Sequence, residues 1–379
     1  MSAYILICLL LALGYAALIL IYFVGWMLIP PFKTRQSKEL VQTETFTILV
    51  PARNEETQIK ACIDSLVSQD FIAGAFEIII INDHSTDGTE SVVRQCMALY
   101  KEHKIVLLNA ASEGFSGKKE GIALGVEMAS FPYIVLTDAD CTRGKYWLNT
   151  LAQFRKEKQA QMIYAPVFFT ANTLFERFQS LEFAGLVGIG GAAIQLKNPN
   201  MCSAANLVFT KQAFVEVGGY ADNKHLASGD DEFLLHKIFK RYPQQVHFLK
   251  NVDAIVYTSP NASVEQLTQQ RRRWVSKSTK YENRYITAIL VGAYFFNLSL
   301  LLNAILAFFI PSFTHLFVQQ IAIKMAAEAL LLGVILRFFK RSDLLLLVPL
   351  VQLFHILYVI IIGVWANVQT YSWKERELK

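Results

Sequence analysis

Four long apolar runs limit what this chain can fold into. Residues 4–29 contain no charged side chain, and residues 285–310, 313–339 and 344–365 form three further runs. Each run is long enough to cross a bilayer as a helix, which needs about 20 residues. The chain is 53% hydrophobic, and these runs hold the excess over a soluble protein. We therefore expect one N-terminal span, a polar middle and about three C-terminal spans.

The charges beside these runs predict how the chain is oriented. Residues 4–29 follow no cationic segment and precede no small-residue cleavage motif, so we expect a retained anchor. Cations near a span stay on the cytoplasmic side. Such cations follow the first span, at Lys33, Arg35 and Lys38, and lie between the third and the fourth, at Arg337, Lys340 and Arg341. This pattern predicts an integral protein of the inner or plasma membrane whose polar middle is cytoplasmic, although four spans would place the final "KERELK" outside.

Cysteine spacing and net charge exclude some classes of protein. The five cysteines show no C-x-x-C spacing, which argues against a zinc site or a disulfide framework and suits a reducing compartment. The net charge of +5 is modest and forms no basic stripe interleaved with aromatic residues. We therefore expect membrane lipids, and no nucleic acid, as partners of the basic residues.

Short apolar runs alternate with helix-like segments between about residues 45 and 167. "FTILVPA", "FEIIIIND", "KIVLLN" and "YIVLTDAD" have the composition of buried strands. Such alternation predicts an α/β domain with a Rossmann-like, mainly parallel sheet. Ligands of these sheets bind beyond the carboxyl ends of the strands. One crevice should therefore collect polar residues that follow the strands, namely Arg53, Glu55, Asp83, Asp138 and Asp140.

Asp138 and Asp140 end the last of these strands, in "YIVLTDADC". Two carboxylates two residues apart repel each other, and holding them together is costly unless a cation lies between them. Mg²⁺ or Mn²⁺ commonly bridges a protein carboxylate to a diphosphate. The pair is therefore a candidate site for a metal-bound nucleoside diphosphate. A plain turn after a strand is the alternative.

Two more segments follow strands and offer polar groups. In "NDHSTDGT", Asp83 can accept hydrogen bonds from a ribose or a base, while turn formation and helix capping explain its neighbours. In "GKKEGIALG", Lys118 and Lys119 lie near a helix start, where backbone N–H groups also favour anions. A solvated helix face explains at least one of these lysines. No P-loop pattern occurs in the chain.

Two charged segments nearer the C-terminus are candidates for catalysis. "SGDDEFLLHKIF" places Asp230, Asp231 and Glu232 in the first turn of a helix, where acids commonly stabilise the helix dipole. One of them, if it faces the crevice, can deprotonate a hydroxyl group. "QRRRW" lies in a basic segment that predicts an interfacial helix at a membrane surface. Its Trp274 can also stack on a sugar while an arginine neutralises a diphosphate.

Together these stretches resemble the membrane-bound family 2 glycosyltransferases, which are inverting enzymes with the GT-A nucleotide-sugar fold. The resemblance runs from about residue 45 to residue 281 and into the trailing spans. It implies that Pro51, Ala52, Arg53 and Glu55 frame the uracil and ribose of UDP and that Asp83 binds the uracil. Lys118 would lie near the nucleotide. Asp138 would contact the nucleotide sugar, and Asp140 would ligate Mg²⁺ or Mn²⁺.

The same resemblance assigns roles to the later segments. "CSAANLVFTKQAF" is similar to the pocket for the donor sugar and acceptor, with Ala205 and Asn206 on its floor. Asp230 would be the base, with Asp231 as the substitute candidate, because Gly229 stands where the family usually has an acid. Gln270, Arg273 and Trp274 match the Q-x-x-R-W motif, which meets the acceptor and the diphosphate. Ala123 and His84 also depart from the usual pattern.

We therefore predict transfer of a sugar from a UDP-sugar to a lipid or lipid-linked hydroxyl at the cytoplasmic membrane face. Processive polysaccharide synthesis coupled to export is the alternative, because Q-x-x-R-W also resembles those synthases. A non-catalytic nucleotide-sugar-binding subunit is a weaker alternative. A sugar nucleotidyltransferase would need a glycine-rich loop after the first strand, and "VPARNEE" has no glycine. The expected domains are an anchor (1–32), a GT-A domain (33–262), an interfacial helix (263–284) and a membrane region (285–379).

Overall fold

The chain divides into two compact units. The computed structural model describes residues 2–35, 44–115, 117–223, 229–276, 284–365, 371–373 and 376–378. One unit, here called the sheet unit, comprises Leu28–Thr170 and Val187–Pro260. The other, here called the helical unit, comprises Met1–Met27, Ala171–Leu186 and Asn261–Lys379. The four-part division expected from the sequence stays a prediction.

The sheet unit contains ten strands and several helices among its described residues. The strands are β1 (Phe46–Ala52), β2 (Phe76–Asn82), β3 (Ile105–Asn109), β4 (Tyr133–Leu136), β5 (Thr142–Arg143), β6 (Met162–Tyr164), β7 (Val167–Phe169), β8 (Leu207–Thr210), β9 (Val246–Phe248) and β10 (Val256–Thr258). The helices are α2 (Ile59–Val67), α3 (Thr89–Leu99), α4 (Ala110–Glu113), α5 (Lys118–Met128), α6 (Trp147–Lys158), α8 (Lys211–Glu216) and α9 (Asp230–Arg241). Short 3₁₀ turns are η2 (Ala204–Asn206), η3 (Ala221–Asn223) and η4 (Val252–Ala254).

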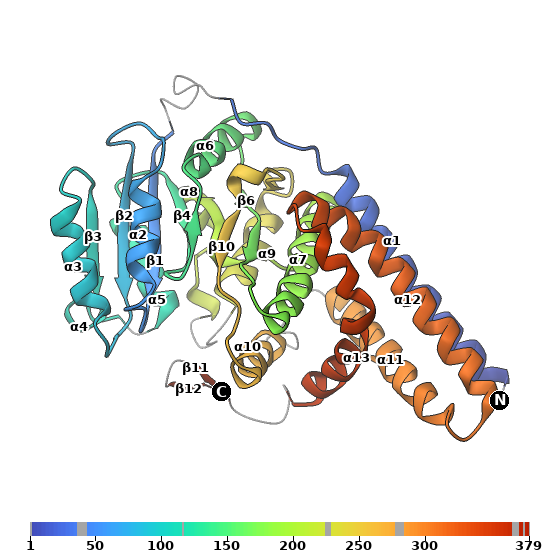
Figure 1. Cartoon of the computed structure of the whole chain (residues 1–379). Coiled ribbons are helices and arrows are strands. Elements are labelled where there is room, and N and C mark those ends of the chain that lie inside the picture. Colours follow the sequence, from blue (N-terminus) through green and yellow to red (C-terminus); the bar gives the residue numbers. More distant parts are fainter. Residues whose placement is uncertain are drawn as a thin grey trace. The chain divides into compact units, whose positions relative to one another are not determined.

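Seven of the strands form one sheet in the order β3-β2-β1-β4-β8-β6-β9 (Figure 1). The β1–β2, β2–β3 and β1–β4 pairs are parallel, as is β6–β9, whereas β8 runs antiparallel to β4 and β6. Every residue of β2 is buried, the continuous apolar pattern expected of a parallel strand covered on both faces. The prediction of a mainly parallel α/β sheet is confirmed. A second sheet has the order β5-β10-β7.

Two glycines let α5 lie close to the main sheet. A Cβ added at Gly121 would come within 2.6 Å of Ile81 Cγ2, and one at Gly125 within 3.1 Å of side-chain atoms of Ile81 and Leu49. These glycines are four residues apart and therefore share one face of the helix. Their lack of a side chain brings the start of α5 near the carboxyl ends of β1 and β2.

Glu77 anchors the opposite end of the strands although it is only 1% exposed. Its carboxylate accepts hydrogen bonds from Thr47 Oγ1 and Ser130 N, both at 2.6 Å, and pairs with Lys104 Nζ at 2.6 Å. Burial alone would raise the pKa of Glu77, but hydrogen bonds from Lys104, Thr47 and Ser130 outweigh it and hold the pKa below its ordinary value. The ionised carboxylate is thus the form that the fold stabilises.

Replacing Glu77 should make stability less sensitive to acid. A depressed pKa contributes stability above the pKa of the unfolded chain, and this contribution is lost as pH falls through the folded pKa. We expect Glu77→Gln to lower the free energy of unfolding near pH 7 by about 1–3 kcal/mol. The difference from wild type should shrink as the pH falls below 4.5, the ordinary pKa of a glutamate. Denaturant unfolding in detergent at several pH values measures it, and a difference independent of pH would contradict this account.

The helical unit is built from long helices and the tail of the chain. Its elements are α1 (Ser2–Leu28), the first part of α7 (Leu174–Gln195), α10 (Val264–Ser276), α11 (Arg284–Leu306), α12 (Pro311–Phe338), η6 (Ser342–Leu347), α13 (Val348–Trp365), β11 (Tyr371–Trp373) and β12 (Arg376–Leu378). In Figure 1, α1 runs beside α12. Tyr15 stacks on Phe296, and Trp26 packs edge-on against Phe338. The first helix therefore packs on helices that are formed almost three hundred residues later.

Three helical segments among the described residues are long and apolar enough to cross a membrane, namely Ala3–Leu28, Arg284–Leu306 and Ser342–Val364. They correspond to three of the four predicted spans and indicate a membrane-associated protein. The remaining prediction, residues 313–339, falls on α12, which is 28 residues long but is not one of these three segments. It differs from them in carrying two charged residues, Lys324 and Glu328, in its middle turns.

Lys324 and Glu328 pair in the interior of the helical unit. Lys324 is fully buried, and its Nζ lies 2.6 Å from Glu328 Oε1 and 2.5 Å from Gln352 Oε1. Tyr15 of α1 donates to the same Glu328 oxygen at 2.5 Å, and Gln352 donates to the other one. An ionisable pair inside a membrane bundle is costly unless its partners are close. The cluster joins α1, α12 and α13.

Removing one member of this ion pair should destabilise the protein more than removing both. Lys324→Met leaves a buried carboxylate without its cation, and we expect the free energy of unfolding to fall by about 3–5 kcal/mol. Lys324→Met combined with Glu328→Gln should recover much of that loss, because neither charge then remains. Unfolding in detergent measures both variants. A double variant that is less stable than the single one would show that the charges are not coupled.

Candidate active site

The loops after β1 and β2 are tied together at the carboxyl ends of the strands. Asp83 N donates to Ala52 O at 2.9 Å, and Arg53 Nη1 donates to Asp83 O at 2.9 Å and to His84 O at 3.1 Å. Pro51 and Ala52 lie in register with the last residues of β2. The four predicted nucleotide-binding residues Pro51, Ala52, Arg53 and Asp83 are therefore brought together.

Further hydrogen bonds fix the same two loops beside Glu55. Asn54 N donates to Ser85 Oγ at 3.0 Å, and Glu55 N donates to Thr89 Oγ1 at 2.8 Å. Asp87 Oδ1 accepts from Thr89 N at 3.0 Å, beside Gly88, which is the N-cap residue of α3. Glu55 thus stands at the start of the helix that follows β2.

Asp83 and Asp138 are connected through the start of α5. Asp83 is 3% exposed, and its Oδ1 lies 3.0 Å from His84 Nδ1 and accepts from Gly117 N at 3.3 Å. The next residue, Lys118, places its Nζ 2.8 Å from Asp138 Oδ1. Lys119 turns elsewhere and lies 5.7 Å from the centre of the Phe233 ring. Of the two lysines considered from the sequence, Lys118 is the one beside the paired acids.

Asp138 and Asp140 have different surroundings although only Ala139 separates them. Asp138 contacts Lys118, whereas Asp140 Oδ2 accepts a hydrogen bond from Thr258 Oγ1 on β10 at 3.0 Å. The turn closes with a hydrogen bond of 3.3 Å from Cys141 N to Asp138 O. The two carboxylates thus meet partners from different elements.

Arg143 lies beneath this turn and is only 7% exposed. Its Nη2 donates to Cys141 O at 2.8 Å and to Thr137 Oγ1 at 3.1 Å, so it forms hydrogen bonds with both ends of the turn. The guanidinium also lies 3.7 Å from Cys62 Sγ and 5.0 Å from the Trp147 ring. Among the described residues it forms no ion pair with a carboxylate.

Two thiols fill the space around this guanidinium. Cys62 and Cys141 are both fully buried, and Cys62 Sγ lies 3.6 Å from Asp138 O. Burial raises the pKa of the Cys62 thiol, although Arg143 acts in the opposite direction. Burial also raises the pKa of Cys141 well above its ordinary value. Both side chains are therefore neutral at physiological pH, and Arg143 is the charged group under the turn.

The 3₁₀ turn η2 lies between the paired acids and the start of α9. Thr137 Oγ1 donates to Ala205 O at 2.8 Å, and Ala204 N donates to Asp231 Oδ2 at 3.1 Å. Asp231 Oδ1 also accepts from Glu232 N at 2.9 Å. The structure thus brings Asp231 to the same site. Asp230 begins α9, but its side chain lies outside the described part of the chain.

Asn206, which was predicted with Ala205 on the floor of the sugar pocket, has its side-chain amide bonded to the protein itself. It is fully buried, and its Nδ2 donates to Pro166 O and Ala254 O, each at 2.8 Å. Its Oδ1 accepts from Trp147 Nε1 at 3.1 Å. Both ends of the amide are therefore occupied by the protein, which fixes η2 in place.

Gln270, Arg273 and Trp274 lie on α10, which belongs to the helical unit. Gln270 Oε1 accepts from Asn261 Nδ2 at 3.0 Å. The Trp274 ring packs against Phe183. The Arg271 guanidinium lies 4.3 Å from the centre of the Trp274 ring. Arg271 is itself paired with Glu182 at 2.9 Å. The predicted contact of these residues with a diphosphate stays a prediction.

The acids at the sheet edge suit a metal that shares its ligands with a substrate. Among the described residues no group of three or more His, Cys, Asp or Glu side chains could hold a metal ion by itself. Mg²⁺ usually binds one or two carboxylates and takes its other ligands from water and phosphate oxygens. Asp140, next to the Thr258 hydroxyl, fits that kind of site, in which a diphosphate completes the ligand set.

Sequence reasoning missed Arg143 and Thr258. Arg143 stands three residues after Asp140, and a lone arginine so close to a pair of acids was a usable signal. Thr258 lies 118 residues from Asp140 in sequence, and no local pattern connects them.

Comparisons with known proteins match this chain to glycosyltransferases. Residues 47–218 match the sequence profile of a family described as glycosyl transferase family 2. Glycosyltransferase AglE of Haloferax volcanii is 25% identical over 188 residues, which cover 49% of this chain and 58% of the relative. The probable glycosyltransferase YdaM of Bacillus subtilis is 26% identical over 255 residues, covering 66% and 57%. The chain thus matches less than two thirds of the length of each of these relatives.

A solved structure shares the fold over nearly the whole chain. The mannosyltransferase PcManGT from Pyrobaculum calidifontis, in complex with GDP-Man and Mn²⁺, superposes with a TM-score of 0.61 at 15% identity. The match covers 96% of this chain and 99% of that one. The sheet unit is therefore a GT-A domain. Residues 47–218 match a glycosyltransferase domain of family 2, the class of enzyme that the sequence motifs indicated.

Arg143 should be needed to hold the acidic turn. Arg143→Met leaves Cys141 O and Thr137 Oγ1 without their donor in a buried site, and each such loss costs about 1–3 kcal/mol. Arg143→Lys should recover only part of the lost stability, because an ammonium group cannot reproduce the forked hydrogen bonds of a guanidinium. Unfolding in detergent measures stability, and maleimide labelling of Cys62 and Cys141 reports opening of the turn. Labelling as slow in Arg143→Met as in wild type, with unchanged stability, would contradict this role.

Proposed function

We propose that the protein is an inverting glycosyltransferase that moves a sugar from a nucleoside-diphosphate donor to a hydroxyl of a lipid or lipid-linked acceptor. UDP-sugars are the expected donors. The acceptor would meet the site at the cytoplasmic face of the inner or plasma membrane. One observation carries the proposal: two neighbouring acids at the edge of a GT-A sheet have different partners, one a lysine and the other a hydroxyl.

The nucleoside would lie on the loops after β1 and β2. Asp83 and Glu55 offer acceptors for N–H and O–H groups of a base and a ribose, and Arg53 fixes the loop that carries them. Asp138 would contact the nucleotide sugar. Lys118 adds positive charge at the start of α5, where backbone N–H groups already favour a diphosphate.

Asp140 would hold a divalent metal together with the donor diphosphate. Such an ion, Mg²⁺ or Mn²⁺, supplies charge that stabilises the departing nucleoside diphosphate. The Mn²⁺ and GDP-Man bound by the structurally similar mannosyltransferase support a metal, and they make a GDP-sugar a donor to test. Arg273, carried by the segment that resembles Q-x-x-R-W, would add a second cation for the leaving group.

Asp230 is the proposed base, and Asp231 is the substitute candidate. Each Asp231 oxygen accepts a backbone N–H bond, which gives this residue a role in fixing η2 and the start of α9. Asp231 is thus engaged in backbone contacts, and its neighbour Asp230 is the acid proposed for proton transfer. The base would take the proton from the acceptor hydroxyl, whose oxygen attacks the anomeric carbon opposite the departing diphosphate.

A donor screen tests the proposed function. The full chain in detergent, with a lipid extract as acceptor, should release UDP or GDP from one sugar donor when Mg²⁺ or Mn²⁺ is present. Chelation should stop the release, and added metal should restore it. We expect Asp140→Asn to lower turnover by at least about 100-fold, because charge on the leaving group is then poorly stabilised. Glu102→Gln, at the surface before β3, is the control for a lost carboxylate.

The product distinguishes the proposed acceptor from the processive alternative. Radiolabel from the donor should enter the solvent extract if the acceptor is a lipid, whereas a long water-soluble polymer would indicate a polysaccharide synthase. Failure to release nucleotide from any donor with either metal would overturn the enzymatic proposal and favour a non-catalytic subunit.

A further inference from the structure

Arg271 stands inside the "QRRRW" segment of α10 but has no role in the proposed function. The roles proposed for Gln270, Arg273 and Trp274 leave open what holds α10 in place. An arginine at a membrane surface usually keeps its charged head in water. Arg271 is instead only 2% exposed, so its guanidinium needs partners within the protein.

The guanidinium of Arg271 pairs with one carboxylate among the described residues. Its Nη2 donates to Glu182 Oε2 at 2.9 Å, and Glu182 lies on the first part of α7, in the same helical unit. The buried Nε and Nη1 atoms of Arg271 have no hydrogen-bond partner in the part of the chain that the structure describes. A buried cation that loses its only anionic partner is strongly destabilised. The orientation of the Arg271 side chain therefore depends on Glu182.

The same guanidinium contacts the tryptophan of the motif. It lies 4.3 Å from the centre of the Trp274 ring, within the range of a cation–π contact. Trp274 also packs against Phe183 of α7, with 6.1 Å between the ring centres. Trp274 is thus held from two sides, by Phe183 directly and by Glu182 through Arg271.

A second polar group of α7 connects to the other end of the motif. Gln179 is 2% exposed, its Nε2 donates to Asn261 O at 2.9 Å, and its Oε1 accepts from Asn261 N at 3.0 Å. Asn261 Nδ2 in turn donates to Gln270 Oε1 at 3.0 Å. Gln179, Glu182 and Phe183 are three and four residues apart, so they share one face of α7. One face of α7 therefore contacts both ends of the "QRRRW" segment.

We propose that Glu182 is a positioning residue for sugar transfer, which acts through Arg271 to fix the turn of α10 that carries Arg273 and Trp274. The inference rests on the proposed function and extends it, because Arg273 can stabilise a leaving diphosphate only if its helix is held in one orientation. A displacement of about 1 Å can lower a rate by about 100-fold. Glu182 itself is not a catalytic residue, since its effect reaches the reaction through Arg271.

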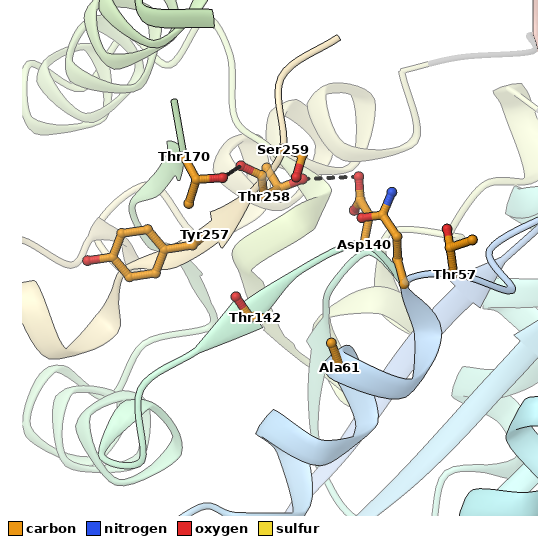
Figure 2. Close-up of a pocket in the computed structure, with 9 residues that line it drawn as sticks. Thr57, Ala61, Asp140, Thr142, Thr170, Tyr257, Thr258 and Ser259 are labelled. Atoms are coloured by element: carbon orange, nitrogen blue, oxygen red, sulfur yellow. Dashed lines mark hydrogen bonds between the residues drawn. The ribbon is translucent and has the colours of Figure 1, made fainter. Parts of the chain in front are cut away.

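The kinetics of Glu182→Gln test this role. The variant keeps the size of the side chain and removes the charge that holds Arg271, and we expect kcat to fall by about 10- to 100-fold. The Kd of free UDP or GDP should not change, because Asp140 and the residues drawn around it in Figure 2 belong to the sheet unit. Arg177→Gln is the matched control with unchanged activity, because it breaks an ion pair between α7 and Asp343 and none with α10.

A double-mutant cycle separates positioning from a general loss of stability. If Glu182 acts through Arg271, Glu182→Gln should have little further effect on kcat in an Arg271→Gln background. The double variant retains neither charge, so it should be at least as stable as Glu182→Gln alone. Effects on kcat that multiply, or a kcat of Glu182→Gln equal to that of wild type, would overturn the proposal. So would a loss of nucleotide affinity as large as the loss of kcat.

A spectroscopic readout keeps the test independent of turnover. The chain has five tryptophans, so labelling with fluorotryptophan should give five fluorine NMR signals in detergent, and Trp274→Phe identifies one of them. That signal should shift in Glu182→Gln and stay in place in Arg177→Gln.

The two readouts together distinguish the positioning role from the proposed function. If the wild type turns over no donor but the Trp274 signal shifts in Glu182→Gln, the positioning of α10 stands and the proposed function fails. If the wild type turns over a donor but neither kcat nor the signal responds to Glu182→Gln, the proposed function stands and the positioning role fails. A fall in kcat without a shift of the signal would also overturn the role, because Glu182 would then act elsewhere.

Discussion

The geometry of the acidic site depends on the guanidinium of Arg143. It lies under the turn with 7% of its surface exposed and bonds to groups on both sides of the two acids, Thr137 before them and Cys141 after them. A buried cation without an ion-pair partner is unfavourable, and so are two carboxylates on one short turn. Because Arg143 bonds to residues on both sides of the two acids, it brings positive charge to the turn that carries them. The turn can therefore keep two acids at the end of an apolar strand before any substrate binds.

From that turn, short hydrogen bonds reach every other described part of the sheet-edge site. Lys118 connects Asp138 to the start of α5, and the preceding residue, Gly117, connects α5 to Asp83. Thr137 connects the turn to η2, and η2 connects to Asp231. The site is thus assembled from groups that the ends of neighbouring elements carry. Its parts are set by backbone and side-chain contacts of the fold, so little rearrangement is needed to present them together.

The sequence predicted this architecture where local patterns were strong. Continuous apolar strands such as "FEIIIIND" and the order of polar residues after them were enough to predict a parallel sheet and to collect Arg53, Asp83, Asp138 and Asp140 at one edge. Contacts between distant segments could not be read in this way. Thr258 meets Asp140 because β10 pairs with β5 in the second sheet, and Asp231 meets Ala204 because η2 leads into β8, which pairs with β4 in the main sheet. The position of Q-x-x-R-W on α10 was predicted, but its neighbours Glu182 and Phe183 come from another helix that carries no motif.

The contact between Tyr15 and Glu328 has a consequence for how the chain is made. The two residues are 313 positions apart, so α1 leaves the ribosome long before its partner exists. Lys324 and Glu328 are four positions apart and can neutralise each other as soon as α12 forms a helix. Pairing of these two charges therefore does not have to wait for α1. The tyrosine can instead join a pair that is already complete, which makes docking of the first helix a late event in the assembly of the helical unit.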